Sequence, residues 1–194
     1  MKIKEEFKKD SMVSLDPGKR SFMTGYTTER TFKIVTNFKR IKDIQEKLNL
    51  FQSLKDTSRI SKKSWKYRRK KLYNKLDGII DELHFKTIRK LEEYNTILLP
   101  SFESQNMVSK SRNRNLNRNL LQLKHYLFQT RIKERCGNRV KICTEEFTSK
   151  TCGICGHLNN VGCKEMFDCE KCGLETDRDV NGARNILLKY LYGS

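Results

Sequence analysis

The sequence has no long hydrophobic run. Within its 194 residues, no window reaches the roughly 18 consecutive apolar residues of a membrane span. No signal peptide precedes the first acidic residues, and no segment is strongly apolar along one face. These absences exclude a membrane-embedded or secreted protein, and we expect an intracellular one with no membrane partner.

Acidic residues are scarce relative to basic ones. The chain has 23 Asp and Glu against 41 Lys and Arg, so its formal net charge is +18 and its pI is about 9.7. Such a field attracts polyanions and releases counterions when phosphates are neutralised. Nucleic acid is the first partner to expect. A merely solvated basic surface or an anionic membrane are the alternatives.

The chain also lacks internal repeats and long low-complexity tracts, and its length suits one moderate domain with an insert. Residues 12–36 alternate apolar and polar side chains between Gly and Pro breaks, which predicts three short antiparallel strands, the first ending at Asp16. Helical spacing begins at Phe38, again at Lys62 and again at Asn115, and a last helix is expected with Asp179 as its N-cap. Apolar runs at 96–100 and 140–145 predict strands. The predicted segments are 1–37, 38–93 (a basic helical insertion), 94–148, 149–175 (a cysteine ribbon) and 176–194.

Seven cysteines are an odd number, which argues against a full set of disulfides. Four of them form two C-x-x-C pairs, the spacing with which tight turns present thiolates to a tetrahedral zinc ion. A chance arrangement, a redox pair or a ligand role for His157 are the weaker interpretations. Four protein ligands leave no position for water, so the zinc is expected to be structural. The predicted ligands are Cys152, Cys155, Cys169 and Cys172, and Cys136, Cys143 and Cys163 are expected to be ordinary core residues.

Several acids stand at the ends of predicted elements. Phosphodiester hydrolysis commonly uses two hard cations held by carboxylates from separate elements. The first candidate is Asp16 at a strand end. The others are Glu145 or Glu146 at the end of the strand expected over 140–145, and Asp177 or Asp179 at the start of the last helix. Taken singly, an Asp at a strand end is often a turn former, and an Asp before a helix is often only its N-cap.

Three sequence blocks carry a resemblance to a known family. SLDPGKRSFMTGY at 14–26, FTSKTCGICG at 147–156, and CEKCG with DRDVNGARNIL at 169–187 resemble the C-terminal nuclease half of the transposon-encoded TnpB family and its eukaryotic and giant-virus relatives, the Fanzor proteins. The resemblance implies an α/β fold, namely an RNase H-like (RuvC) domain with a helical insertion and an inserted four-cysteine zinc ribbon. It also implies a Mg²⁺-dependent DNA endonuclease with two metal ions and a guide RNA.

The resemblance assigns roles to particular acids. Asp16 would be the first acid and Asp179 the third, with Asp177 as the runner-up. The second acid departs from the usual pattern, because Pro100 stands where the family commonly has a glutamate. Fanzor-like members instead have a glutamate just before the TS-x-x-C block, which corresponds to Glu145. Glu146 would point to the opposite face of a strand, and Glu103 is a fallback in the polar loop beyond residue 100.

The helical insertion interleaves cations with aromatic rings, an arrangement that can hold phosphates and stack on bases. A helix with its rings in the core and its lysines solvated is the alternative. The predicted nucleic-acid-binding residues are Lys62, Lys63, Trp65, Lys66, Arg68, Arg69, Lys70 and Lys71.

Family members carry an N-terminal half that grips guide RNA, whereas only about fifteen residues precede Asp16 here, so a truncated chain is expected. The alternative function is a noncatalytic nucleic-acid-binding remnant or accessory protein. A zinc-ribbon transcription factor would leave the DPG and DRDVNGARN blocks unexplained. A eukaryotic or viral owner would place the protein in the nucleus, and any other in the cytoplasm.

Overall fold

The structure is a computed structural model that describes residues 12–18, 21–53, 61–101, 123–144, 146–162 and 165–193. The chain divides into two compact units. The first comprises residues 1–35 and 88–194, and the second comprises residues 36–87. None of the helices among the described residues is long and apolar enough to cross a membrane.

A five-stranded sheet forms the centre of the first unit, in the order β3-β2-β1-β4-β5. The strands are β1 (Met12–Asp16), β2 (Met23–Tyr26), β3 (Thr31–Ile34), β4 (Thr96–Pro100) and β5 (Val140–Cys143). β1 pairs antiparallel with β2, and β2 with β3, whereas β4 lies parallel to both β1 and β5. The carboxyl ends of β1, β4 and β5 therefore meet at one edge of the sheet.

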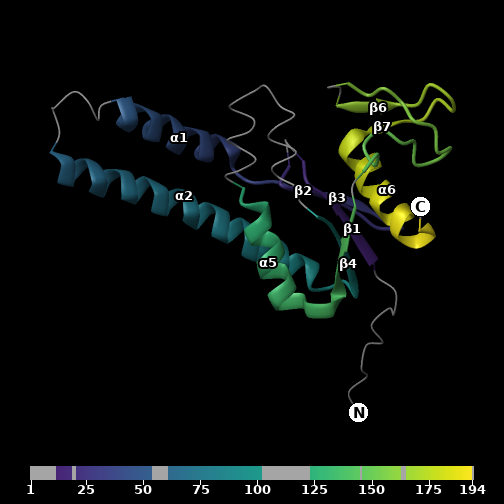
Figure 1. The fold of residues 1–194 in the computed structure, drawn as a ribbon, viewed down its shortest axis with the longest axis horizontal. Coiled ribbons are helices and arrows are strands. Elements are labelled where there is room, and N and C mark those ends of the chain that lie inside the picture. Colours follow the sequence, from purple (N-terminus) through teal and green to yellow (C-terminus); the bar gives the residue numbers. More distant parts are fainter. Residues whose placement is uncertain are drawn as a thin grey trace, which may run out of the picture. The chain divides into compact units, whose positions relative to one another are not determined.

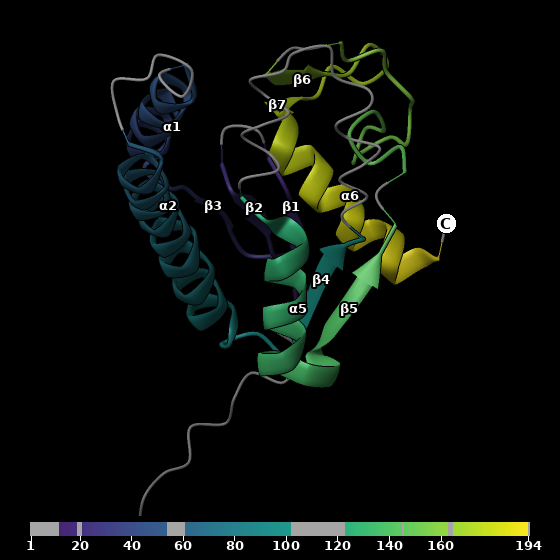
Figure 2. The ribbon, with the colours of Figure 1, turned by 60° about the vertical axis from the view of Figure 1, so that its left-hand side comes forward.

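Helices cover both faces of this sheet (Figure 1). α6 (Arg178–Tyr192) packs on one face, where Ile186 and Leu187 form a cluster with Leu98. α5 (His125–Cys136) lies on the other face (Figure 2). Its His125 stacks on Phe22 at a centroid distance of 4.9 Å, and its Phe128 meets the same ring edge-on. Val13 and Leu15 of β1 are fully buried, as a strand between two helical layers requires.

The second unit consists of α1 (Phe38–Ser53) and most of α2 (Lys62–Leu91), which run side by side in Figures 1 and 2. Ile41 and Ile44 are the buried apolar residues of α1, and Leu76 and Ile80 belong to the buried face of α2. Trp65 of α2 donates its Nε1–H to the carbonyl of Phe51 at 2.7 Å, which ties the start of α2 to the end of α1.

A two-stranded sheet follows in the cysteine-rich segment. β6 (Met166–Asp168) and β7 (Glu175–Asp177) pair antiparallel, and β7 leads directly into α6. Phe167 is fully buried and packs with Cys152, Val161 and Cys169 in a small core of its own. The ribbon is thus a separate hydrophobic cluster that is joined by its last strand to the helix that covers the main sheet.

Most elements match the expectations from the sequence. The three strands within 12–36, the strand at 96–100 and the helices beginning at Phe38 and Lys62 are confirmed. The strand expected over 140–145 ends at Cys143, and the helix expected from residue 115 is described only from His125. The pair β6–β7 was missed, because three-residue strands are too short to give a periodic signal.

Gly25 in β2 lies under an aromatic ring of the neighbouring strand. It pairs with Phe32 of β3, and a Cβ added to it would lie 2.3–2.7 Å from three Phe32 ring atoms. The Phe32 ring is itself held by the Lys90 ammonium group, 4.1 Å from its centroid, and by stacking near Tyr94. The ring covers the backbone that glycine leaves bare, an arrangement that stabilises glycine within a sheet.

We therefore expect Gly25→Ala to lower the free energy of unfolding by about 1–3 kcal/mol, since the ring must leave its site. Gly78→Ala is the matched control, because nothing lies within 4 Å of its Cβ position on an exposed part of α2. There alanine should be neutral or stabilise by about 0.5–1 kcal/mol. Thermal and urea unfolding measure both variants, and equal effects at the two glycines would contradict the account.

Candidate active site and metal centre

Asp16 ends β1 at the edge where the parallel strands terminate, and it lies against α6. A Cβ added to Gly182 of α6 would lie 2.6 Å from Oδ2 of Asp16 and 3.1 Å from its Cγ. Ser14 of β1 fixes the same contact between strand and helix, because its hydroxyl donates to the carbonyl of Ala183 at 2.6 Å. The helix can approach the carboxylate this closely only because residue 182 has no side chain.

Asp179 belongs to the first turn of α6 and lies beside the turn that follows β1. Its Oδ2 is 3.1 Å from the position that a Cβ on Gly18 would occupy. Asp16 and Asp179 therefore flank the same Pro17–Gly18 turn, one at the strand end and one at the helix start. The structure brings these two predicted acids into one small region, although they are far apart in sequence.

Asp177, not Asp179, is the N-cap of α6, which corrects the expectation for this helix. Its Oδ1 accepts from the backbone N–H groups of Asp179 and Val180, at 2.9 and 3.3 Å. Its Oδ2 accepts from Nζ of Lys33 on β3 at 2.6 Å. Partial burial opposes ionisation, but Lys33 and the two amides outweigh it and lower the pKa of Asp177. Both oxygens of the Asp177 carboxylate are thus engaged in holding the start of α6.

The second acid is not located by the structure. Glu145 and the fallback Glu103 lie outside the described residues, and Glu146 is exposed. Pro100 and Cys143 are paired at the ends of β4 and β5, and the N–H of Ser101 donates to the carbonyl of Cys143 at 3.2 Å. β5 thus ends at the same sheet edge as β1, with Glu145 two residues further along the chain.

The four predicted cysteine ligands converge. Their Sγ atoms all lie within 4.8 Å of one another, and the Cys152–Cys172 and Cys155–Cys169 pairs are 3.6 Å apart. Tetrahedral Zn–S bonds of about 2.3 Å would separate the sulfurs by about 3.8 Å. The cluster is therefore positioned to bind a metal ion. Of the remaining cysteines, Cys136 is buried and Cys143 half-buried, and Cys163 lies outside the described residues.

Two thiols of the cluster have pKa values shifted in opposite directions. Burial opposes ionisation of the Cys169 thiol, but the N–H groups of Cys172 and Lys171 and the neighbouring thiols lower its pKa to about 6. The N–H of Leu174 favours the Cys172 thiolate, but burial and the other three sulfurs raise its pKa to about 12. A thiolate at Cys169 therefore disfavours a second one at Cys172, and a bound cation would relieve this repulsion.

Two asparagines of α6 join the cysteine ribbon to the helix that carries Asp179. Asn181 accepts from the N–H of Gly153 at 3.1 Å and donates to the carbonyl of Thr151 at 2.8 Å. Asn185 donates to the carbonyls of Thr148 and Thr151 at 2.8 and 2.7 Å. Both side chains are buried. No local pattern predicts these bonds, although both asparagines stand in the DRDVNGARN block.

The predicted basic residues of the second unit lie along the first half of α2. Lys62, Lys63, Lys66, Arg68, Lys70 and Lys71 are exposed. Trp65 is half-buried, and besides its bond to Phe51 it carries the guanidinium of Arg69 5.1 Å from its ring centroid. These contacts favour a structural role for Trp65. Tyr67, at 68% exposure, and Tyr73, at 41%, are rings of this segment that face solvent.

Comparisons with known proteins agree with this organisation. A family model described as Cas12f1-like, TNB domain, matches residues 125–186. A putative transposase of Paramecium bursaria Chlorella virus 1 is 34% identical over 191 residues, covering 93% of this chain and 43% of the viral protein. A TnpB-like protein of Acanthamoeba polyphaga mimivirus is 29% identical over 199 aligned positions, covering 93% of this chain and 37% of that protein.

The fold is also similar to a solved structure, that of a Cas12f1–sgRNA–target DNA complex. The TM-score is 0.64 at 19% identity, and the match covers 91% of this chain and 49% of that chain. The likeness shows a common mixed α/β fold. The chain spans less than half the length of each of these three proteins.

The Lys33–Asp177 pair should contribute to stability in a pH-dependent way. The pKa of Asp177 is lowered from its ordinary value of 3.8, so the stabilisation is present above pH 3.8 and is lost as the pH falls through the lowered pKa. Asp177→Asn keeps a cap but removes the ion pair, and Asp177→Ala removes both and should cost about 1 kcal/mol or more at pH 7. In thermal unfolding, the midpoint of each variant should lie below that of the native chain at pH 7, and both gaps should shrink below pH 3.8. Differences that are independent of pH would contradict the assignment.

Replacement of one clustered cysteine should abolish metal binding. We expect the native chain to carry one tightly bound ion, and Cys172→Ser to lose it, because three thiolates leave the tetrahedron open. Elemental analysis of the purified proteins measures this directly. Cys143→Ser is the matched control, since Cys143 lies outside the cluster. Full metal content in Cys172→Ser would contradict the assigned ligand set.

Proposed function

Because the chain belongs to the TnpB family, we propose that it is the nuclease portion of an RNA-guided DNA endonuclease, in which carboxylates hold catalytic Mg²⁺ ions. The observation that carries the proposal is the meeting of Asp16 and Asp179 around the Pro17–Gly18 turn. Two carboxylates brought to the same turn from distant parts of a chain can together provide oxygen ligands for divalent cations.

The fold supports an RNase H-like (RuvC) assignment. Three antiparallel strands continue into two parallel ones in the order β3-β2-β1-β4-β5, and a helix carries the last acid across the central strand. In this arrangement the carboxyl ends of β1, β4 and β5 and the N-terminus of α6 converge. Acids placed at those ends can share metal ions, as two-metal phosphodiester hydrolysis requires.

We propose Glu145 as the second acid, in place of the glutamate that Pro100 replaces. The support is its position two residues after the end of β5, at the same sheet edge as Asp16. Asp16, Glu145 and Asp179 would hold two Mg²⁺ ions. These ions would supply an activated water and stabilise the leaving oxygen. The residues themselves would fix the geometry, with Asp177 and Lys33 holding the first turn of α6 in place.

For the cysteine cluster we propose zinc. Four thiolates at tetrahedral separations suit this ion, and a closed set of protein ligands makes it structural. Its function would be to hold the Thr151–Gly153 backbone, which Asn181 and Asn185 grip from α6. The zinc would thereby support the helix that positions Asp179 without contacting the substrate itself.

The proposed substrate is DNA, and the proposed partner is a guide RNA. The exposed cations of α2 would hold these nucleic acids without reading their sequence. The net charge of +18 supports a polyanionic partner. The noncatalytic binding protein remains the second candidate, favoured only by the Pro100 departure from the usual pattern. Cleavage measurements separate the two.

We expect the purified chain to cut labelled DNA when Mg²⁺ is added, and Asp16→Asn, Asp179→Asn and Glu145→Gln each to reduce the rate by at least about two orders of magnitude. DNA affinity should stay within about twofold, because the replaced groups bind metal and not phosphate. Glu134→Gln is the matched control, since Glu134 is an exposed acid of α5 outside the proposed site and should tolerate the change. Binding without any cutting would favour the noncatalytic function, and equal loss of cutting in Glu134→Gln would overturn the assignment of Glu145.

A further inference from the structure

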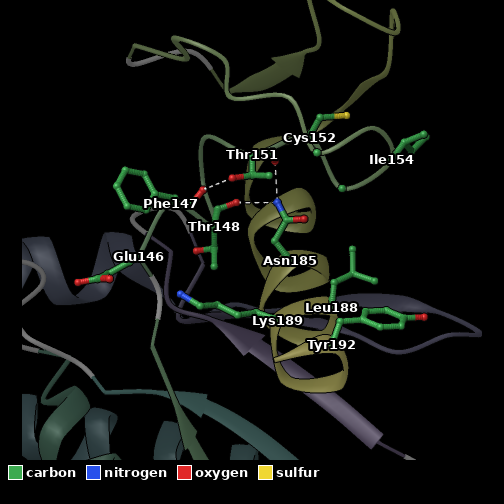
Figure 3. Close-up of a pocket in the computed structure, with 12 residues that line it drawn as sticks. Glu146, Phe147, Thr148, Thr151, Cys152, Ile154, Asn185, Leu188, Lys189 and Tyr192 are labelled. Carbon is green, nitrogen blue, oxygen red and sulfur yellow. Dashed lines mark hydrogen bonds between the residues drawn. The ribbon is translucent and has the colours of Figure 1, made fainter. Parts of the chain in front are cut away.

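A hollow of about 490 Å³ lies beside the cysteine ribbon, away from the Pro17–Gly18 turn in sequence and built by other residues. One wall is the segment 146–156, which leads into the first C-x-x-C pair, and the floor is the second half of α6 (Figure 3). Its volume is in the range of small-ligand sites. Nothing in the proposed hydrolysis uses it.

Exposed apolar groups line this hollow. Phe147 is 65% exposed, Ile154 is 61% exposed and Tyr192 is 78% exposed. Leu188, in the floor formed by α6, is half-buried. Figure 3 shows Phe147 on one side and Ile154 and Tyr192 on the other. Exposed rings and aliphatic groups gathered around one concave surface indicate a binding site more often than scattered surface residues do.

Phe147 is held in an unusual conformation. Its φ is 64°, in the left-handed region that bulky side chains seldom adopt. Its carbonyl accepts from the N–H groups of Lys150 and Thr151, each at 3.0 Å, and from the Thr151 hydroxyl at 2.9 Å. The next carbonyl, of Thr148, accepts from Asn185. The surrounding bonds thus over-determine a strained backbone that presents a ring to solvent, a combination that is frequent at functional sites.

Charge identifies the chemical class of the ligand. Lys189 lines the hollow, and its side chain extends from α6 toward the segment that carries Glu146 and Phe147 (Figure 3). A flat ring beside an ammonium group, in a protein of net charge +18, matches a base joined to a phosphate. Glu146 also lines the hollow, and its charge opposes a phosphate there. We propose that this hollow receives a nucleotide of single-stranded nucleic acid, with the base against Phe147 and a phosphate near Lys189.

The inference rests on the proposed function, since it takes nucleic acid as the ligand, but it can be tested without cleavage. The probe is a single-stranded oligonucleotide carrying 5-iodouracil, made once as DNA and once as RNA, because either could supply the nucleotide. Irradiation of the complex without added Mg²⁺, and without a chelator that would strip the cysteine cluster, should cross-link the oligonucleotide to Phe147 or Tyr192. Mass spectrometry of the cross-linked peptide locates the site.

Affinity measurements on variants complete the test. Phe147→Gly should relieve the backbone strain and leave the thermal midpoint unchanged or higher, yet weaken single-strand binding about five- to hundredfold by removing a stacking ring. Tyr126→Leu is the matched control, because that ring is 71% exposed on α5 outside the hollow and should not matter. Lys189→Gln should reduce the salt dependence of binding by about one phosphate contact, and Glu146→Gln should tighten binding.

Unchanged affinity in both Phe147→Gly and Lys189→Gln, or cross-links confined to α2, would overturn the proposal. Loss of self-association in Phe147→Gly with unchanged oligonucleotide binding would assign the hollow to a protein contact instead, and would overturn it equally. A chain that cuts DNA but cross-links elsewhere loses only this inference. A chain that cross-links at the hollow but never cuts loses only the proposed nuclease activity.

Discussion

The close contact between α6 and β1 is the interaction on which the candidate active site depends. Ser14 donates to the carbonyl of Ala183, and Gly182 places bare backbone against the carboxylate of Asp16. Because α6 is seated this deeply, its first turn reaches the Pro17–Gly18 turn and brings Asp179 there. Any side chain at residue 182 would have to displace either the helix or the acid. The meeting of Asp16 and Asp179 therefore depends on the close packing of Gly182 against β1.

The cysteine ribbon reinforces that contact from the other side. Its first knuckle is bonded to Asn181 and Asn185, and its last strand, β7, continues into the N-cap of α6. The helix is thus held at its start by Asp177 and Lys33, along its length by the ribbon, and beneath by β1. A metal ion in the ribbon would order the backbone of Thr151 and Gly153, to which α6 is hydrogen-bonded. Under the proposed function, this would explain why a metal-binding ribbon precedes the helix that carries Asp179.

Local sequence patterns were sufficient for most strands and helices, for the end of β1 at Asp16 and for the grouping of the four cysteines, because period, turn chemistry and C-x-x-C spacing are all local. They could not distinguish Asp177 from Asp179, since both are good N-caps in the same tripeptide. Only long-range contacts with Lys33 and Gly18 separate their roles. Three further features likewise depend on partners that no local pattern reveals. They are the structural role of Trp65, the hydrogen bonds of Asn181 and Asn185, and the left-handed backbone of Phe147. The strands β6 and β7 were too short to be recognised.

The most direct test of the central claim is to locate Mn²⁺, as a stand-in for Mg²⁺, by anomalous scattering in crystals of the chain. If Asp16 and Asp179 hold the catalytic metal ions, two ions about 4 Å apart should be coordinated by these acids. Both ions should be absent when Asp179 is replaced by asparagine. Mn²⁺ bound only elsewhere, or ions that persist at this edge of the sheet in Asp179→Asn, would contradict this claim.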